Sequence, residues 1–119
     1  MSIIHLEEYL HIYVDKSFQK ELLKCLSGFP NTKHFNEWFA FSLSILDDPE
    51  RNFLLEFPKR FEQIEENIYS MRYKGKKNIR ILFCKSQGLI QILSCAFIER
   101  NKSDYDLAKT KVRDRKKYY

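Results

Sequence analysis

The sequence predicts an α+β fold in which helices pack on a face or an edge of one sheet. Three observations predict it. Apolar residues recur at helical spacing in two segments after a first strand, side chains alternate through three later segments, and a capped helical segment ends the chain. With 119 residues, 44 % of them hydrophobic, the chain is expected to form one domain over residues 1–119.

The N-terminal part is expected to contain one strand and two helices. Residues 11–15 are mostly β-branched and aromatic, which favours a strand. Residues 16–26 and 31–47 each place apolar side chains on one helical face, and the second helix is expected to stop at Asp48–Pro49. The stretch 49–65 holds two prolines and many charges, so we expect an irregular connection there.

The C-terminal part is expected to form a three-stranded antiparallel meander followed by a helix. The strands are predicted over residues 67–73, 79–85 and 89–98. Their side chains alternate, and the turn sequences KGKKN and SQG separate them. Residues 103–119 are expected to form the helix, with Ser103 and Asp106 as a capping box at its start.

The charge is distributed unevenly along the chain. Residues 1–71 carry a net charge of −5 and residues 72–119 a net charge of +10, within a total of +5. Such asymmetry suggests a surface that faces a polyanion, and nucleic acid is the first candidate. The alternative is a solvated basic face, and part of the basic run at 109–117 also suits a helix C-terminus. Composition does not decide between the two.

The sequence contains no standard enzyme motif. Three glycines leave no phosphate-binding loop, and the three histidines lie in the N-terminal third, away from the cations. Three widely spaced cysteines give no zinc pattern and argue against a disulfide framework. We therefore expect no metal and no cofactor. Without a long apolar run or a secretory signal pattern, we expect a cytoplasmic protein that makes no membrane contact.

Basic residues of the meander and the terminal helix form the candidate site. Arg72 and Arg80 are expected to lie close together, because a short hairpin joins their strands. Arg100 and Lys102 follow the third strand, and Tyr105 lies in the first turn of the helix. If these side chains meet at one end of the sheet, they offer cations for a phosphate and a phenol for stacking or proton transfer.

Each of these cations also has an ordinary explanation. Solubility alone explains an exposed lysine such as Lys76 at the turn. Arg72 and Arg80 are harder to explain in this way, because their neighbours are strand-core residues and a cation there needs a partner. That partner is either a ligand or a structural carboxylate such as Glu65 or Glu66.

Two long segments of the C-terminal half resemble a family of bacterial toxins. IYSMRYKGKKNIRILFC and ILSCAFIERNKSDYDLAKTKVRDRKKYY are similar to the RelE/HigB superfamily, and nearest to its phage-derived HigB-like branch. The matching positions are Ile68–Arg72, Ile79–Phe83, Phe97–Arg100, Ala108, Arg113 and Tyr118. The predicted order of strand, two helices, meander and helix is also that family's architecture, so the resemblance implies a RelE-like fold for most of the chain.

The resemblance implies the toxin of a type II toxin–antitoxin system, acting as a ribosome-dependent mRNA endonuclease. Such toxins cleave mRNA without a metal ion, because basic residues and often a tyrosine assist attack by the 2′-hydroxyl on its own phosphate. By position, Arg72 and Arg80 would bind the scissile phosphate. Arg100 and Lys102 would add charge or donate a proton to the leaving oxygen.

The family's tyrosine has two counterparts in this chain. Tyr105 matches the tyrosine of one branch and Tyr118 matches the terminal tyrosine of another. Further contacts with RNA are expected from Lys74, Lys76, Lys77, Lys109, Arg113 and Lys116. Glu99 stands where the family often has a lysine, and this acid either weakens phosphate binding, serves as the general base, or marks an inactive relative.

The implied partners are the ribosome, its mRNA and a helix-turn-helix antitoxin encoded beside the toxin, with a toxin–antitoxin heterotetramer as one possible assembly. Two other functions stay open. One is a non-catalytic relic of the same fold that binds nucleic acid or the ribosome. The other is a toxin of the same fold that acts on DNA gyrase.

Overall fold

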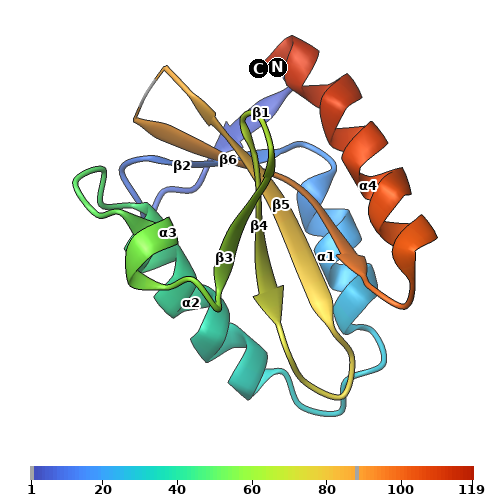
Figure 1. Ribbon diagram of the computed structural model, residues 1–119. Helices are drawn as coiled ribbons and strands as arrows, with labels where there is room; N and C mark the ends of the chain where they lie inside the picture. The colour runs from blue at the N-terminus through green and yellow to red at the C-terminus, as the bar shows by residue number, and fades with distance from the viewer. Residues whose placement is uncertain (1, 88) are drawn as a thin grey trace.

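Six strands form one mixed sheet in the computed structural model, which describes residues 2–87 and 89–119 (Figure 1). The strands lie side by side in the order β1-β2-β6-β5-β4-β3. β2 and β6 run parallel, and the other neighbouring pairs are antiparallel. Their bounds are β1 (Ile3–His5), β2 (Ile12–Asp15), β3 (Phe61–Glu65), β4 (Ile68–Tyr73), β5 (Ile79–Ser86) and β6 (Ile90–Ile98).

Four α-helices cover this sheet. They are α1 (Phe18–Leu26), α2 (Lys33–Leu46), α3 (Phe53–Glu56) and α4 (Lys102–Arg115), and a 3-10 turn η1 (Lys116–Tyr118) follows α4. α2 and α3 lie on one side of the sheet and α4 on the other (Figure 1). The two ends of the chain meet beside the last turn of α4, where the Ser2 hydroxyl donates to the Tyr118 carbonyl at 2.9 Å.

Alternation along the central strands divides the core into two layers. Met71, Ile81 and their neighbours on one face pack against α2 and α3 in the larger layer. Leu82 and Cys84 belong to the smaller layer, which Ala108 and Val112 of α4 complete. The structure is thus an α+β fold, as the sequence predicts. Within the described ranges no helix is long and apolar enough to cross a membrane.

The sheet contains two more strands than the sequence predicts. β3 lies inside the stretch 49–65 that was expected to be irregular, and it pairs with β4 as the edge strand. Phe61 is its only fully buried side chain, so the apolar alternation that reveals a strand is weak there. β1 has three residues and pairs only with β2, which leaves too short a segment for any periodicity.

The start of α4 also differs from the predicted one. Asn101 is the N-cap: its side chain accepts the Asp104 N–H at 3.2 Å, and the Asp104 carboxylate accepts the Asn101 N–H at 3.3 Å. The capping box therefore joins these two residues rather than Ser103 and Asp106. The predicted turn SQG includes Gly88, which lies outside the described residues.

Candidate functional site

The β4–β5 hairpin places Arg72 directly opposite Arg80, in agreement with the proximity that the sequence predicts. Directly paired residues of antiparallel strands share a face of the sheet, and two like charges in such a pair destabilise it. This face is the one on which α4 packs, and the Tyr105 ring of α4 lies 4.8 Å from the Arg80 guanidinium carbon. The opposed charges therefore need partners, and the two arginines differ in the partners they have.

Arg80 is buried and neutralised by the protein itself. Only 8 % of the residue is exposed. Its Nε donates to Glu99 at 2.9 Å, and its Nη1 donates to Glu62 at 3.1 Å. Burial opposes the charged form, but these hydrogen bonds outweigh it and raise the pKa of the Arg80 guanidinium above its usual value. Its structural carboxylates are Glu62 and Glu99, and not the Glu65 or Glu66 that the sequence suggested.

Arg72 has no such neutralising partner. Its Nε is buried and has no hydrogen-bond partner among the described residues. No carboxylate of residues 2–87 and 89–119 forms an ion pair with it. Arg72 and Arg80 line one small hollow, together with Glu62 and Ser70. The hollow thus presents one free guanidinium beside one that is already paired.

Tyr105 covers this group of charges from α4. Its ring lies over Arg80, and the ammonium of Lys109 lies 5.2 Å from the ring centroid. Burial raises the pKa of the Tyr105 phenol, and the positive charge of Arg80 opposes that rise only in part. The phenol therefore keeps its proton at neutral pH and is able to donate it.

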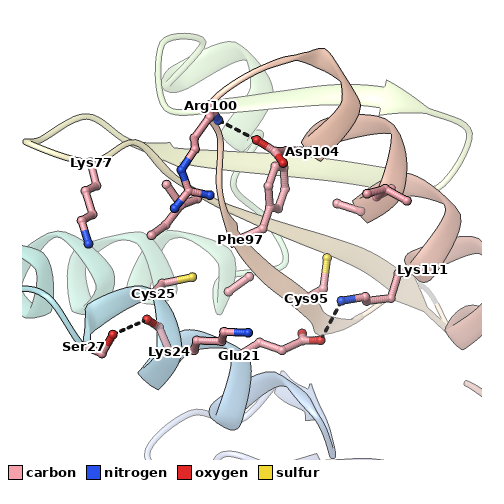
Figure 2. Close-up of a pocket in the computed structure, with 14 residues that line it drawn as sticks. Glu21, Lys24, Cys25, Ser27, Lys77, Cys95, Phe97, Arg100, Asp104 and Lys111 are labelled. Atoms are coloured by element: carbon pink, nitrogen blue, oxygen red, sulfur yellow. Dashed lines mark hydrogen bonds and ion pairs between the residues drawn. The ribbon is translucent and has the colours of Figure 1, made fainter.

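The structure does not bring Arg100 into this group. Arg100 and Lys77 line a separate cavity of about 510 Å³ between α1, β6 and α4, and Figure 2 shows both side chains directed into it. The floor of that cavity includes Cys25 and Cys95, and burial raises the pKa of these thiols to about 11 and about 12. Lys102 is exposed at the first position of α4.

Tyr118 lies in η1, beyond the end of α4 opposite to Tyr105. It is thirteen positions after Tyr105, which is about 20 Å along the helix axis. Tyr118 is 72 % exposed. The next residue, Tyr119, is half-buried: its hydroxyl donates to Asp15 at 2.8 Å and lies 2.6 Å from the Ser94 hydroxyl. Of the two tyrosines that the resemblance offers, only Tyr105 stands beside the arginine pair.

The other cations predicted to contact RNA fall into two groups. Those at the β4–β5 turn, Lys74 and Lys76, are exposed, while the Lys77 ammonium lies 5.9 Å from the Phe29 ring centroid.

The cations of the C-terminal helix have partners within the chain. Arg113 donates twice to Glu65, Lys109 pairs with Asp106 at 3.5 Å, and Lys116 donates to the Glu66 carbonyl at 3.4 Å.

A second cavity adjoins the arginine pair and contains residues that sequence reasoning did not select. It is the edge groove, lined by His34 and Trp38 of α2, by residues 56–60 and by residues 72–74. His34 was expected to lie away from the cations, but it lines this groove together with Lys59, Arg60 and Lys74, and its Nδ1 lies 2.8 Å from the Tyr73 hydroxyl. The sequence signal for this groove was the pair of adjacent cations in FPKRF, Lys59 and Arg60, which lie directly before β3.

Comparison with known proteins adds no assignment. No protein-family model matches the chain, and neither a curated protein nor a solved structure matches it. The side chains themselves therefore carry the functional argument. In the part of the chain that the structure describes, no three His, Cys, Asp or Glu side chains gather closely enough to hold a metal ion.

Proposed function

We propose that the chain is a metal-independent endoribonuclease whose site is the group of Arg72, Arg80, Glu62, Glu99 and Tyr105. The observation that carries this proposal is the difference between the two opposed arginines. Among residues 2–87 and 89–119, Arg72 has a buried Nε without a partner, whereas Arg80 is fixed by two carboxylates. An unpaired guanidinium that is held against a second one favours an anion between them, and phosphate fits the fork of an arginine.

The proposed reaction needs a base, a charge-stabilising group and an acid. Glu62 removes the proton from the ribose 2′-hydroxyl, because its side chain is 57 % exposed and only one of its oxygens bonds Arg80. The 2′-oxygen attacks the adjacent phosphorus while Arg72 and Arg80 stabilise the added negative charge. Tyr105 gives its proton to the departing 5′-oxygen. The products are a 2′,3′-cyclic phosphate and a 5′-hydroxyl.

The resemblance to RelE/HigB toxins supplies the biological setting of the proposal. In that setting the substrate is mRNA on the ribosome in the cytoplasm, and cleavage stops translation. A helix-turn-helix antitoxin neutralises the toxin, and an acidic antitoxin surface would associate rapidly with the exposed cations of the β4–β5 turn. The RelE-like fold belongs to this proposal as well.

Induced expression in growing cells tests the function. The wild-type chain is expected to arrest growth and to introduce new 5′ ends within translated reading frames. Arg72→Ala is expected to reduce cleavage by about 100-fold, the usual effect of losing one donor to a developing oxyanion. Intact mRNA in arrested cells, accompanied by DNA damage, would instead indicate the alternative that acts on DNA gyrase.

A second candidate function is RNA binding without cleavage. The two carboxylates that neutralise Arg80 favour it, because they compete with a phosphate for the same guanidinium. This function predicts salt-sensitive binding of RNA and no new RNA ends with the wild-type chain. The same end-mapping experiment therefore separates the two candidates.

A further inference from the structure

The edge groove lies where the sheet loses its last strand. β3 pairs with β4 only as far as Phe61 opposite Met71, and residues 72–74 continue beyond that pair. The segment before β3 follows them, with the Arg72 N–H donating to the Arg60 carbonyl at 3.1 Å. α2 closes the other side, and the resulting cavity has a volume of about 510 Å³. This volume falls in the range of sites for small organic ligands.

One wall of the edge groove is aromatic. Trp38 and Tyr73 meet at an angle of 62° with their ring centroids 5.3 Å apart. His34 is held beside them by the bond between its Nδ1 and the Tyr73 hydroxyl. Rigid aromatic side chains of this kind provide the flat apolar surface on which a nucleobase stacks.

The other wall is positively charged. The Arg60 guanidinium carbon lies 5.7 Å from the Trp38 ring centroid, and its Nη1 donates to the Ser42 hydroxyl at 2.8 Å. Arg60 forms no ion pair with any carboxylate of the described ranges. Burial alone lowers the pKa of its guanidinium. The acid that lines the groove, Glu56, is bound to Arg51 at 2.9 Å.

The edge groove is continuous with the hollow that holds the arginine pair. Lys59, Arg60 and Arg72 line both cavities, and Glu62, Ser70 and Arg80 line the hollow beyond them. A ligand in the groove therefore meets Lys59 and Arg60, which form no ion pair with any carboxylate of the described ranges. The Arg60 guanidinium is held over the Trp38 and Phe41 rings and donates to the Trp38 carbonyl at 3.3 Å. Aromatic surface with positive charge beside it matches a base and its phosphate.

We propose that the edge groove binds one nucleotide of single-stranded RNA, with its base against Trp38 and His34 and its phosphate on Lys59 and Arg60. The choice of RNA as the ligand rests on the proposed function, because the bound nucleotide would be the neighbour of the cleaved phosphate. Base stacking in the groove would fix the RNA so that the next phosphate reaches Arg72, Arg80 and Tyr105.

The fluorescence of Trp38 tests this inference directly, because Trp38 is the only tryptophan in the chain. Adenosine 5′-monophosphate added to the full chain is expected to quench it saturably. Ribose 5-phosphate, which has the phosphate but no base, is expected to bind at least about tenfold more weakly, as the loss of one stacked base implies. Equal binding of the two would overturn the base site and leave a phosphate site only.

Matched variants assign the signal to the groove. Arg60→Gln is expected to lower the affinity for the nucleotide about tenfold, which is the effect of losing a charge-assisted hydrogen bond. Lys74→Ala, at an exposed residue that leaves the core untouched, is expected to weaken it about threefold. Lys24→Ala, which removes an exposed cation from the other cavity, is expected to change nothing. Equal losses in Lys74→Ala and Lys24→Ala would mean non-specific attraction and would refute the site.

The outcome is separable from that of the proposed function. Nucleotide binding without any RNA cleavage would refute the endonuclease and leave the groove as the contact surface of an RNA-binding protein. Cleavage of RNA by a chain whose Trp38 does not respond to the nucleotide would refute the groove and leave the endonuclease.

Discussion

At the scale of single residues, the two opposed arginines occupy equivalent positions but have different partners. Arg80 has two carboxylates and the Ser70 hydroxyl as partners, so it satisfies the hydrogen-bonding needs of a buried charge. Arg72 has a buried Nε with no partner in the described chain. Because an unsatisfied buried donor costs free energy, we propose that Arg72 serves ligand binding rather than stability.

The stability of two alanine variants should reflect this difference. Arg80→Ala is expected to lower the free energy of unfolding by about 2–3 kcal/mol, because two carboxylates and a serine lose a common partner. Arg72→Ala is expected to lower it by less than about 1 kcal/mol. Urea denaturation followed by circular dichroism measures both, and equal losses would contradict the account.

Tyr105 allows a test of proton transfer that leaves packing unchanged. Tyr105→Phe keeps the ring over Arg80 and its edge contact with Phe97 but removes the hydroxyl. We expect RNA cleavage to fall by about 100-fold, as for loss of a general acid, with an unchanged thermal midpoint. Tyr118→Phe is the matched control, since Tyr118 is exposed at the other end of α4. A Tyr105→Phe protein that cleaves at the wild-type rate would exclude Tyr105 as the acid.

At the scale of elements, α4 is fixed at both ends. Asn101 and Asp104 cap its start over the arginine pair. At its end, Arg115 donates to Glu21 of α1 at 3.0 and 2.6 Å, and Lys111 donates to the same carboxylate at 3.2 Å. Through these contacts α1 holds the helix that positions Tyr105.

The contacts of Arg115 and Lys111 with Glu21, here called the clamp, predict a dependence of stability on pH. Burial alone would raise the pKa of Glu21, but the hydrogen bond and charge of Arg115 lower it below the ordinary 4.5. The unfolded chain therefore binds this proton at a higher pH than the folded chain. The stabilisation is complete above pH 4.5 and is lost as the pH falls through the folded pKa.

Glu21→Gln tests the clamp. Its free energy of unfolding is expected to be lower than that of the wild type at pH 7 and to fall less steeply below pH 4.5. Glu50→Gln changes an exposed loop carboxylate and serves as the control. If Glu21→Gln and the wild type lost stability in parallel through the acid range, Glu21 would not be the group responsible.

The elements that the sequence predicts well are those with strong alternation or clear boundaries. β4, β5 and β6 alternate around buried residues such as Ile81 and Leu82, and their hairpin fixes Arg72 opposite Arg80. β3 was not predicted from the sequence, because it is an edge strand that buries mainly Phe61 and therefore shows little apolar alternation. The edge groove escapes for a different reason, since His34 and Lys74 are far apart in sequence and only the packing of α2 brings them together.

At the scale of the whole molecule, folding redistributes the charge asymmetry of the sequence. Acids from the negative half pair with cations of the C-terminal helix, as Glu65 does with Arg113 and Glu21 with Arg115. The helix is therefore less basic than its sequence suggests. The cations at the edge groove, Arg60 and Arg72, have no such carboxylate among the described residues. The sequence predicted a basic surface formed by the meander and the terminal helix, whereas Arg60 of the edge groove belongs to neither.

RNA binding should depend on salt according to the number of these cations. Four phosphate contacts, from Lys59, Arg60, Arg72 and Lys74, predict a slope of about −3 for log affinity against log salt with single-stranded RNA. Lys74→Ala is expected to reduce the magnitude of the slope by about 0.7. Fluorescence anisotropy of a labelled oligonucleotide measures it. If Lys74→Ala left the slope unchanged and Lys111→Ala reduced it, the result would indicate that RNA binds at α4 and not at the edge groove.

The chemistry of the RNA ends formed by the chain tests the central claim most directly. Translated mRNA exposed to the wild-type protein is expected to carry 5′-hydroxyl and 2′,3′-cyclic phosphate ends, because the ribose 2′-oxygen attacks its own 3′-phosphate and displaces the 5′-oxygen of the next nucleotide. Arg72→Ala, which is expected to remain folded, should yield almost none of these ends. New ends that carry a 5′-phosphate, or the same cyclic phosphate ends at wild-type yield from Arg72→Ala, would contradict the account.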